Sequence, residues 1–397
     1  MYVVLDERGI FGVDLDELAA HLLKEKVAGH VWSRTVTFRP MADLSGEERQ
    51  AARQHFGALG TQQAREPGEV HRREMRIIKR TGKRPLLINL ISHDNGVGLT
   101  QDVRLLRELF AGEGHEVRFV EWRDGSGDAD INVYLELFDQ RHLRTAPVHI
   151  GLFNLEWYDK HHVSSLGQMT QLWAKSQEAY RIYEHHGRGA WPVYFTGFLS
   201  RDMRTDLGEG PGKVKERTCL HVRGKASQKA TDIVLETWRR HGDKLPKLIV
   251  TSAQEFDGCG PHQNHPNVTI DIGYKSEAEL ASLMTRCRFH VCPSETEGWG
   301  HYIAEAISTE AVVVTVDASP MNEHIRPDFG ILLPSAPVEQ GLVVRHRTDP
   351  DVMAQAILML MRKDDAELDE MGKRARRHWE ARQAAFREKA LALVSMV

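Results

Sequence analysis

The feature that most constrains this chain is the stretch Cys292–Glu305, which reads CPSETEGWGHYIAE. The short apolar segment Phe289–Cys292 leads into it and predicts a buried strand. After it, Ile303, Ala306 and Ile307 recur at the spacing of a helix. Because the free N–H groups at the start of a helix attract anions, a loop between a strand and a helix offers a site for a phosphate. The stretch therefore predicts an α/β fold with a ligand-binding loop.

Two glutamates bracket this loop. Glu297 lies in it beside Gly298 and Gly300, which let backbone approach a ligand closely. Glu305 follows after seven intervening residues, about two turns into the predicted helix. The spacing of the two glutamates, set in Pro-Ser-x-x-Glu-Gly-x-Gly, resembles the signature of GT4-like retaining glycosyltransferases, which have the GT-B fold.

This resemblance implies roles for the loop residues. In that family the loop backbone holds the diphosphate and sugar of the donor, the first Glu contacts hydroxyls of the transferred sugar, and the second binds the ribose. These roles fall here on Glu297 and Glu305. The other donor-binding positions implied are Gly298, Trp299, Gly300 and His301. The alternative is a structural strand–loop–helix unit with solvated carboxylates.

A second motif lies upstream, between the predicted strand Thr218–Val222 and a helix. It holds three cations, Arg223, Lys225 and Lys229. Cations are unfavourable at a helix N-terminus unless an anion binds there, and a diphosphate leaving group is such an anion. GT4-like enzymes supply an Arg and a Lys from this turn, although here Ala230 stands where Gly is usual.

The resemblance assigns Lys229 to the diphosphate and leaves Arg223 and Lys225 as alternatives for the second cation. We take Glu297, Lys229 and Arg223 as catalytic candidates and Lys225 as a donor-binding one. Surface charge at a helix start is the alternative interpretation of this cluster.

The apolar run Pro85–Ile91 predicts the first strand of a parallel sheet, buried on both faces. A glycine-containing turn and a predicted helix, Thr100–Ala111, follow it, which is the phosphate-binding arrangement of a Rossmann half. The turn resembles the glycine loop of GT4-like enzymes and is not a full dinucleotide motif. Gly98 is therefore a donor-binding candidate, and His93 and Asn95 are acceptor-side candidates.

Polar residues also follow the predicted strand Val148–Phe153. Because ligands bind at the carboxyl ends of parallel strands, Asn154 and Glu156 are pocket candidates. The sequence Asn-x-Glu-Trp is similar to stretches in bacterial and viral GT4-like proteins. The sequence does not assign a general base, for which His93, His149 and Glu156 are alternatives.

The predicted fold is α/β GT-B, with two Rossmann-like domains facing across a cleft and an N-terminal α+β extension. The expected parts are the extension at 1–84, the acceptor domain at 85–206, the donor domain at 207–375, and a C-terminal helix at 376–397 that packs back on the acceptor domain. We also expect a Ser-x-x-Glu cap at Ser276, a helix opened by Asp317–Glu323, and a solvated face that includes Arg374, Arg376 and Arg377.

Bulk properties narrow the class of protein. The net charge of −4 gives no overall basic field for nucleic acid. No apolar run reaches the roughly 18 residues of a membrane span, and the N-terminus lacks a signal-peptide pattern, which predicts a cytoplasmic protein. Residues 71–84 are strongly basic and predict either a solvated helix and linker or a contact for an anionic acceptor, a nucleic acid or the inner membrane face.

The spacing of Cys259, His262 and His265 supplies three possible zinc ligands. A fourth ligand at a standard spacing is missing, and the segment is rich in Gly and Pro, so we expect no metal and no cofactor. The four cysteines fit a cytosolic protein without a disulfide framework.

The resemblance to GT4-like enzymes implies a glycosyltransferase that moves a hexose or pentose from a nucleotide-diphosphate sugar to a hydroxyl acceptor with retention, and the three cations of the upstream motif predict that it is metal-independent. The expected acceptor is a glycan or a lipid-linked saccharide. The alternatives are transfer to a modified nucleic-acid base or a protein, a sugar-nucleotide epimerase or phosphorylase, and a non-catalytic scaffold that binds a nucleotide sugar or glycan. The oligomeric state is not predicted.

Overall fold

The computed structural model describes residues 2–6, 9–15, 37–40, 84–96, 98–136, 139–205, 215–257, 259–262 and 266–396. The chain forms two compact units, one of Met1–Arg84 with Lys389–Val397 and one of Pro85–Glu388. The first contains three antiparallel strands in the order β2-β1-β3, namely β1 (Tyr2–Asp6), β2 (Gly9–Leu15) and β3 (Thr37–Pro40). The helices expected near 16–26 and after Ser45, and the basic residues 71–83, lie outside the described residues.

The larger unit contains two parallel sheets. The first has six strands in the order β5-β4-β6-β7-β8-β9. They are β4 (Leu87–Ser92), β5 (Glu116–Glu121), β6 (Ile131–Tyr134), β7 (Val148–Gly151), β8 (Gln171–Ala174) and β9 (Val193–Phe195). Its helices include α4 (Gly98–Gly112) and α5 (Gln177–Gly187), with 3-10 turns at Gln140–Arg144 and Lys160–Gln168. We call residues 85–205 the first sheet domain.

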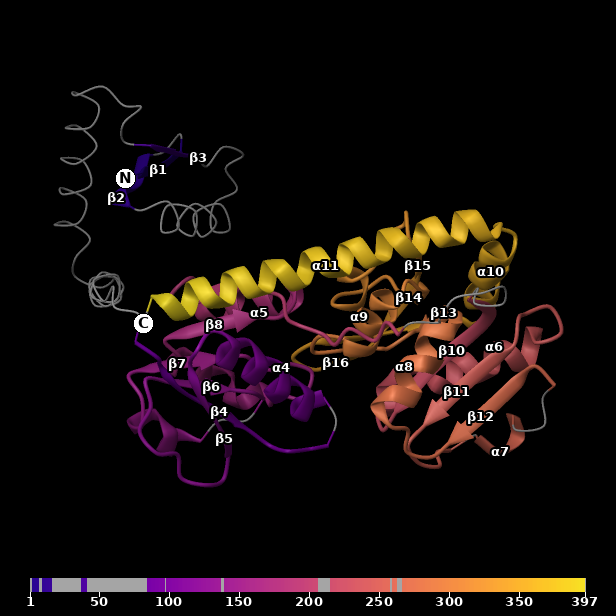
Figure 1. Cartoon of the computed structure of the whole chain (residues 1–397), viewed down its shortest axis with the longest axis horizontal. Coiled ribbons are helices and arrows are strands. Elements are labelled where there is room, and N and C mark those ends of the chain that lie inside the picture. Colours follow the sequence, from indigo (N-terminus) through magenta and orange to yellow (C-terminus); the bar gives the residue numbers. More distant parts are fainter. Residues whose placement is uncertain are drawn as a thin grey trace. The chain divides into compact units, whose positions relative to one another are not determined.

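The second sheet also has six parallel strands, in the order β12-β11-β10-β13-β14-β15. They are β10 (Glu216–Gly224), β11 (Leu248–Ser252), β12 (Val268–Ile272), β13 (Cys287–Cys292), β14 (Val312–Val316) and β15 (Gly330–Leu333). The order reverses between β10 and β13, and ligands of such sheets bind at the carboxyl ends of the strands at this point. We call residues 215–364 the second sheet domain (Figure 1).

The core of the second sheet explains its apolar strands. Every residue of β13 and β14 is buried, as expected for strands covered on both faces. The covering helices are α6 (Thr231–His241), α8 (Glu277–Arg286), α9 (His301–Ser308) and α10 (Pro350–Met361), with a short α7 (Cys259–His262). The sequence-based prediction of an α/β fold built from two Rossmann-like domains is confirmed.

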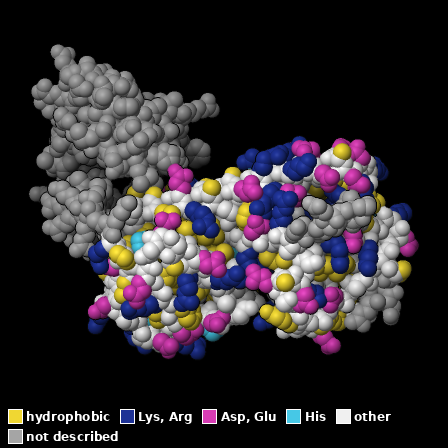
Figure 2. All heavy atoms as spheres, in the orientation of Figure 1, with side chains coloured by type: hydrophobic (Ala, Val, Ile, Leu, Met, Phe, Trp, Pro, Cys, Tyr) yellow, Lys and Arg dark blue, Asp and Glu magenta, His cyan; other side chains and the backbone are white. Residues whose placement is uncertain are grey.

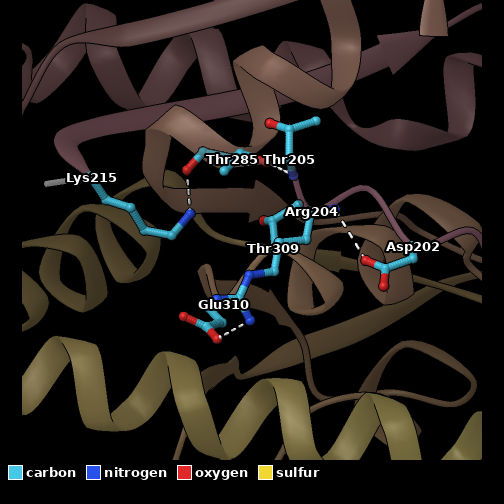
Figure 3. A pocket seen from close by; sticks show the side chains of 7 residues that line it. All are labelled: Asp202, Arg204, Thr205, Lys215, Thr285, Thr309 and Glu310. Carbon is cyan, nitrogen blue, oxygen red and sulfur yellow. Dashed lines mark hydrogen bonds and ion pairs between the residues drawn. The ribbon is translucent and has the colours of Figure 1, made fainter. Parts of the chain in front are cut away.

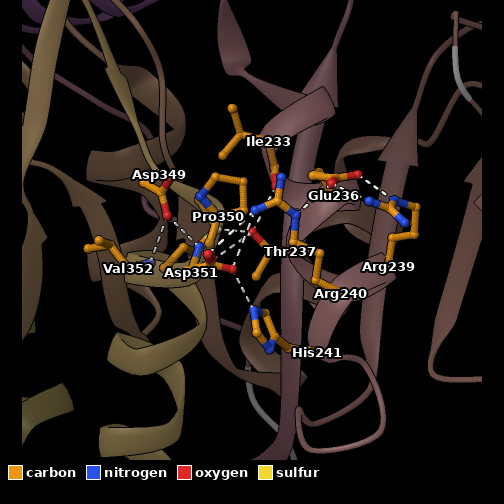
Figure 4. Close-up of polar contacts among 11 residues, drawn as sticks. Ile233, Glu236, Thr237, Arg239, Arg240, His241, Asp349, Pro350, Asp351 and Val352 are labelled. Atoms are coloured by element: carbon orange, nitrogen blue, oxygen red, sulfur yellow. Dashed lines mark hydrogen bonds and ion pairs between the residues drawn. The ribbon is translucent and has the colours of Figure 1, made fainter.

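Helix ends follow their capping residues. Ser276 and Glu279 form the predicted capping box at α8. Asp349 accepts backbone hydrogen bonds at the start of α10, and its neighbour Asp351 lies 2.7 Å from Nε2 of His241 in α6 (Figure 4). The helix expected after Asp317 is wrong, because only a 3-10 turn, Met321–Glu323, forms before β15 begins.

The described part of the chain ends with the long helix α11 (Asp365–Ser395), which passes along both sheet domains in Figure 1. Its Phe386 packs edge-on against Trp173 of β8, with ring centroids 6.3 Å apart. The expectation that Arg376 belongs to a solvated face is wrong. Its guanidinium is paired with Asp202 at 2.6 and 2.7 Å and donates to the carbonyl of Ser308 at 2.7 Å.

Acidic and basic side chains are mixed on the described part of the face that Figure 2 shows. A hairpin of β16 (Ser335–Gln340) and β17 (Val344–Thr348) completes the strands. None of the described helices is both long and apolar enough to cross a membrane.

Candidate functional site

Lys229 and Glu297 meet at the carboxyl ends of β10 and β13. The Lys229 ammonium donates to Oε1 of Glu297 at 2.6 Å and lies 3.5 Å from the centre of the Tyr302 ring. Ser294 Oγ donates to the same carboxylate oxygen, also at 2.6 Å. Both members of the pair keep 15% of their side-chain surface exposed, so a ligand can reach them.

The other two cations of the upstream motif lie on the same edge. Arg223 is the second-last residue of β10, and its guanidinium lies 4.4 Å from the centre of the Phe256 ring and 3.3 Å from Ser252 Oγ. Lys225 is exposed and reaches toward the first sheet domain, since a Cβ built on Gly96 would lie 4.0 Å from its Nζ. Gly98 is the exposed first residue of α4. The loops from both sheets are therefore brought together here.

The second predicted glutamate has an unexpected partner. Because α9 begins at His301, Glu305 lies about one turn into the helix rather than two. Its Oε1 accepts from Nε of Arg201 at 2.7 Å, and this carboxylate side chain is only 6% exposed. Arg201 also lies 3.8 Å from Glu277, which in turn pairs with Arg104 of α4 at 2.8 Å.

The loop between β13 and α9 is fixed by contacts on several sides. Gly300 has a φ of +90°, a conformation that favours glycine. The Trp299 indole is buried and donates to Ser200 Oγ at 2.9 Å, while its ring lies 4.5 Å from that of His324. His301 Nε2 lies 2.6 Å from Oδ1 of Asp102 in α4. The loop is thus anchored to the first sheet domain.

Asp102 is part of a buried polar network. The Lys175 ammonium, 1% exposed, donates to Oδ2 of Asp102 at 2.6 Å and to Oδ1 of Asn154 at 2.8 Å. Burial alone would raise the pKa of Asp102, but the Lys175 charge and the His301 contact outweigh it and hold that pKa below its usual value. Asn154 in turn donates to Glu136 at 3.2 Å.

Gly298 explains why Asn154 and Glu156 belong to the site. A Cβ on Gly298 would lie 2.5 Å from Asn154 Oδ1 and 2.7 Å from Glu156 Oε1, so only glycine fits. Burial, followed by the nearby carboxylates of Glu297 and Glu136, raises the pKa of Glu156 to about 8. Both pocket candidates, Asn154 and Glu156, therefore lie directly against the loop that follows β13.

The other two candidates for the general base, His93 and His149, contact residues away from the loop that follows β13. His93 lies 3.0 Å from Glu121 on an exposed part of the first sheet domain, beside Asn95. His149 is buried within β7, where its Nδ1 lies 3.1 Å from the Tyr134 hydroxyl and burial lowers its pKa. Among the three alternatives, Glu156 is the one placed against the loop.

A separate pocket of about 490 Å³ lies near the amino ends of strands β10 and β13 of the second sheet (Figure 3). Lys215 and Thr285, which line it, precede β10 and β13, whereas ligands of parallel sheets bind where strands end. Lys215 donates to the backbone carbonyl of Thr285, and burial lowers its pKa to about 8. Arg204 and Glu310 pair across the pocket at 2.7 Å. This pocket is distinct from the Lys229–Glu297 site.

Metal ligation finds no support in the part of the chain that the structure describes. Within it, no group of three or more His, Cys, Asp or Glu side chains is arranged to hold a metal ion. The side chains of His262 and His265 lie outside the described residues, so the expectation for that cluster stays a prediction.

Sequence reasoning missed Asp102, Lys175 and Arg201. Lys175 carried a usable signal, because it directly follows a buried strand and therefore lies on the ligand edge of the sheet. Asp102 sits inside a helix and Arg201 in a connecting segment, and their partners are 199 and 104 residues away in sequence. Local patterns do not reveal such pairings.

Comparison of the amino-acid sequence with known families gives one match. Residues 262–378, less than a third of the chain, match the family model described as Glycosyl transferases group 1. This segment contains Glu297 and Glu305 but not the cations of the upstream motif. No curated protein sequence matches the chain.

Several solved structures resemble the chain over most of their own length. Sucrose-phosphate synthase from Thermosynechococcus elongatus is 16% identical, with 78% of this chain and 97% of that chain covered and a TM-score of 0.58. A glycosyltransferase from Rickettsia africae is 11% identical, with 78% and 98% covered and a TM-score of 0.59. Anabaena HepE, solved with UDP and glucose, is 12% identical, with 79% and 100% covered and a TM-score of 0.57.

At these identities the structures establish the fold and leave the activity open. The two Rossmann-like domains form a GT-B fold, and the segment 262–378, which begins within the second domain and extends into α11, matches the Glycosyl transferases group 1 family in sequence.

Proposed function

We propose that this protein is a retaining glycosyltransferase of the GT4-like type that transfers a hexose or pentose from a nucleotide-diphosphate sugar to a hydroxyl acceptor. The acceptor we favour is a glycan or a lipid-linked saccharide. Residues 85–206 would form the acceptor domain and 207–375 the donor domain. The observation that carries this proposal is the Lys229–Glu297 pair at the strand ends, 2.6 Å apart and accessible to a ligand.

The cations around this pair suit a diphosphate leaving group. When a sugar–phosphate bond breaks, negative charge develops on the diphosphate, and preorganised donors stabilise it. Arg223, Lys225 and Lys229 bring three positive charges to one edge, and the N-terminal N–H groups of α9 add a favourable dipole. Because protein cations supply this charge, we propose that transfer does not require a divalent metal.

Glu297 suits the sugar side of the same bond. Lys229 and Ser294 hold its Oε1. In the proposed reaction this carboxylate faces the sugar ring and stabilises the positive charge that develops there. In the proposed reaction the C1–O bond to phosphate breaks while the acceptor oxygen bonds to C1 on the same face. The acceptor proton passes to the departing diphosphate oxygen, so no base on the protein is required. Glu305, held by Arg201, would bind the ribose.

The comparisons support a nucleotide sugar as the donor. HepE was solved with UDP and glucose, and a pneumococcal O-GlcNAc transferase with a TM-score of 0.50 was solved with UDP and GlcNAc. The sequence match to Glycosyl transferases group 1 covers both glutamates. Contact with nucleic acid or a membrane through residues 71–84 stays a prediction, since 71–83 lie outside the described residues.

A thermal-shift screen with UDP, GDP, ADP and their glucose conjugates tests this proposal. A nucleotide present at 100 times its Kd stabilises the folded protein by about 2.7 kcal/mol. We expect one nucleotide family to raise the Tm, and Lys229→Ala and Glu305→Ala to abolish that shift. The matched controls are Lys373→Ala and Glu370→Ala, an exposed pair on α11, which should keep it.

The outcomes separate the alternatives. A folded wild type that none of these nucleotides stabilises would contradict the proposal. Binding without any release of nucleoside diphosphate from the sugar nucleotide, even with saccharide acceptors, would favour a non-catalytic scaffold. Slow release that depends on Lys229 would support the enzyme.

A further inference from the structure

Glu156 carries a buried oxygen without a partner. Its Oε2 is inaccessible to solvent and makes no hydrogen bond in the described structure. Its other oxygen, Oε1, lies against the donor loop, 2.7 Å from where a Gly298 Cβ would be. Buried polar groups are normally hydrogen-bonded, because leaving one unpaired destabilises the folded protein. An unpaired oxygen excluded from solvent is tolerated far better in an uncharged carboxyl group than in a carboxylate, so this geometry favours a protonated Glu156. Oε1, which lies beside the loop, is the oxygen that a ligand would contact.

The charged groups around Glu156 disfavour its ionised form. Glu297 faces it from the loop after β13 and Glu136 from the segment after β6, and both raise its pKa. Lys175, after β8, lowers that pKa, but its ammonium already donates to Asp102 and Asn154. Tyr183 of α5 is also close, since burial and then the neighbouring Tyr158 and Glu156 raise the pKa of its phenol. With burial added, the pKa of about 8 leaves Glu156 mostly protonated at neutral pH.

The surroundings also select the chemistry of a partner. A phosphate would be repelled by the nearby carboxylates, and the cations that suit it are Arg223, Lys225 and Lys229. A neutral carboxylic acid offers one O–H donor and an acceptor oxygen, which matches a hydroxyl group that both donates and accepts. The side of the loop that Gly298 presents to Glu156 is therefore suited to an uncharged polyol.

We propose that Glu156 acts as a neutral carboxylic acid that hydrogen-bonds, through Oε1, a sugar hydroxyl beside Gly298, and that it is not the base of the reaction. This inference rests on the proposed function. The hydroxyl belongs to the transferred sugar or to a saccharide acceptor, and the two sources share the same chemistry.

The protonation of Glu156 is testable without any substrate. In wild type minus Glu156→Gln difference infrared spectra at pH 7, we expect the C=O band of a protonated carboxylic acid. The band should fade as the pH rises through about 8. The exposed control Glu116→Gln should give no such band. A spectrum without this band at pH 7 would overturn the role assigned to Glu156, whatever the protein binds.

The sugar contact is tested by binding and turnover. We expect Glu156→Gln, which keeps a donor and an acceptor, to bind UDP-glucose (or the sugar nucleotide preferred in the screen) like the wild type. Glu156→Leu should bind it about tenfold more weakly while binding the free nucleoside diphosphate normally. That pattern assigns the hydroxyl to the donor sugar.

If Glu156→Leu instead keeps donor binding and donor hydrolysis but loses transfer to saccharides, the hydroxyl belongs to the acceptor. Normal binding, hydrolysis and transfer in Glu156→Leu would refute the contact, and loss of transfer in Glu156→Gln would indicate a base. A wild type that no sugar nucleotide stabilises would overturn the sugar contact together with the proposed function. The infrared result would still stand in that case.

Discussion

His301 at the start of α9 lies 2.6 Å from Asp102 in α4, and this contact joins the loop that follows β13 to the first sheet domain. Asp102 is 2% exposed, and its other oxygen accepts a hydrogen bond from the Lys175 ammonium. One buried carboxylate therefore contacts both His301 and Lys175. Lys175 extends the network to Asn154, which contacts Gly298 of the same loop. One buried network therefore contacts this loop both at His301 and at Gly298, in addition to the hydrogen bond from Trp299 to Ser200.

Removing Asp102 should be strongly destabilising. Asp102→Ala leaves the Lys175 ammonium buried without its carboxylate, a change that typically costs about 3–5 kcal/mol. Urea denaturation of the variant measures this loss. Glu108→Ala on the same helix breaks only an exposed pair with Arg104 and should cost about 0.3–0.5 kcal/mol. Equal losses in the two variants would contradict the importance of the buried network.

Gly298 should tolerate no side chain. In Gly298→Ala the new methyl group would lie 2.5 Å from Asn154 Oδ1, so one of the two must move, at a cost of about 1–3 kcal/mol. We also expect the nucleotide-dependent Tm shift to fall. Gly112→Ala is the control, because no atom lies within 4 Å of its added Cβ, and it should be neutral or stabilising by up to about 1 kcal/mol. A Gly298→Ala protein that matches this control would refute the close contact.

The stability of the protein should decline on mild acidification. His221 is buried between Thr231 and the Val291 carbonyl, and burial, then the nearby cations, lower its pKa from 6.5 to about 4. Between these values the unfolded chain binds the extra proton, so stability is full above pH 6.5 and falls as the pH decreases toward 4. The contribution lost at pH 5 is about 2 kcal/mol.

Denaturation at pH 7 and pH 5 measures this effect. His221→Gln lowers stability at both values but should reduce the difference between them. His162→Gln changes a side chain that is 76% exposed and should leave the difference as in the wild type. An unchanged difference in His221→Gln would assign the acid sensitivity to other groups.

Arg376 and its neighbour Arg377 should respond differently to truncation. Arg376 makes two hydrogen bonds to Asp202 and one to the Ser308 carbonyl, and charged hydrogen bonds of this kind contribute about 1.5–3 kcal/mol. Arg376→Ala should therefore destabilise by about that amount. Arg377 is exposed, and Arg377→Ala should change the free energy of unfolding by at most about 0.5 kcal/mol. Calorimetric unfolding of the two variants measures these changes in stability. Equally small losses in both would indicate that Arg376 and Arg377 lie on one solvated face of the helix.

Local sequence patterns predicted the parallel sheets well, because strands buried on both faces appear in the sequence as continuous apolar runs. The runs Phe289–Cys292 and Thr218–Val222 are strands, and Ser276 caps α8 as its spacing required. Glu297 and Glu305 were selected through the resemblance of their spacing to a family motif, and their roles stay a prediction.

Contacts between segments far apart in the chain could not be predicted, because they produce no local sequence pattern. Arg376 looks like an ordinary surface residue, and only the tertiary fold brings it to Asp202, 174 residues away. Arg201 is likewise unremarkable in a segment without periodicity, yet it holds Glu305. The helix expected after Asp317 failed because the chain makes one 3-10 turn and enters β15 within a few residues.

The Arg201–Glu305 pair leads to the last prediction, which concerns ribose. If Glu305 binds ribose hydroxyls, the wild type should prefer the best ribonucleoside diphosphate over its 2′,3′-dideoxy analogue by about tenfold or more. Glu305→Ala should bind the two analogues equally. Arg201→Ala should weaken the preference without abolishing it, because Glu305 remains but loses the 2.7 Å contact that orients it.

Titration calorimetry with both nucleotides measures these preferences. Glu310→Ala provides the control, since Glu310 pairs with Arg204 in the pocket near the amino ends of β10 and β13. It should keep the full preference. If Glu305→Ala still discriminates as the wild type does, Glu305 does not bind the ribose. Its pairing with Arg201 would then be structural, because a carboxylate buried at 6% exposure needs a cation whether or not a nucleotide is bound.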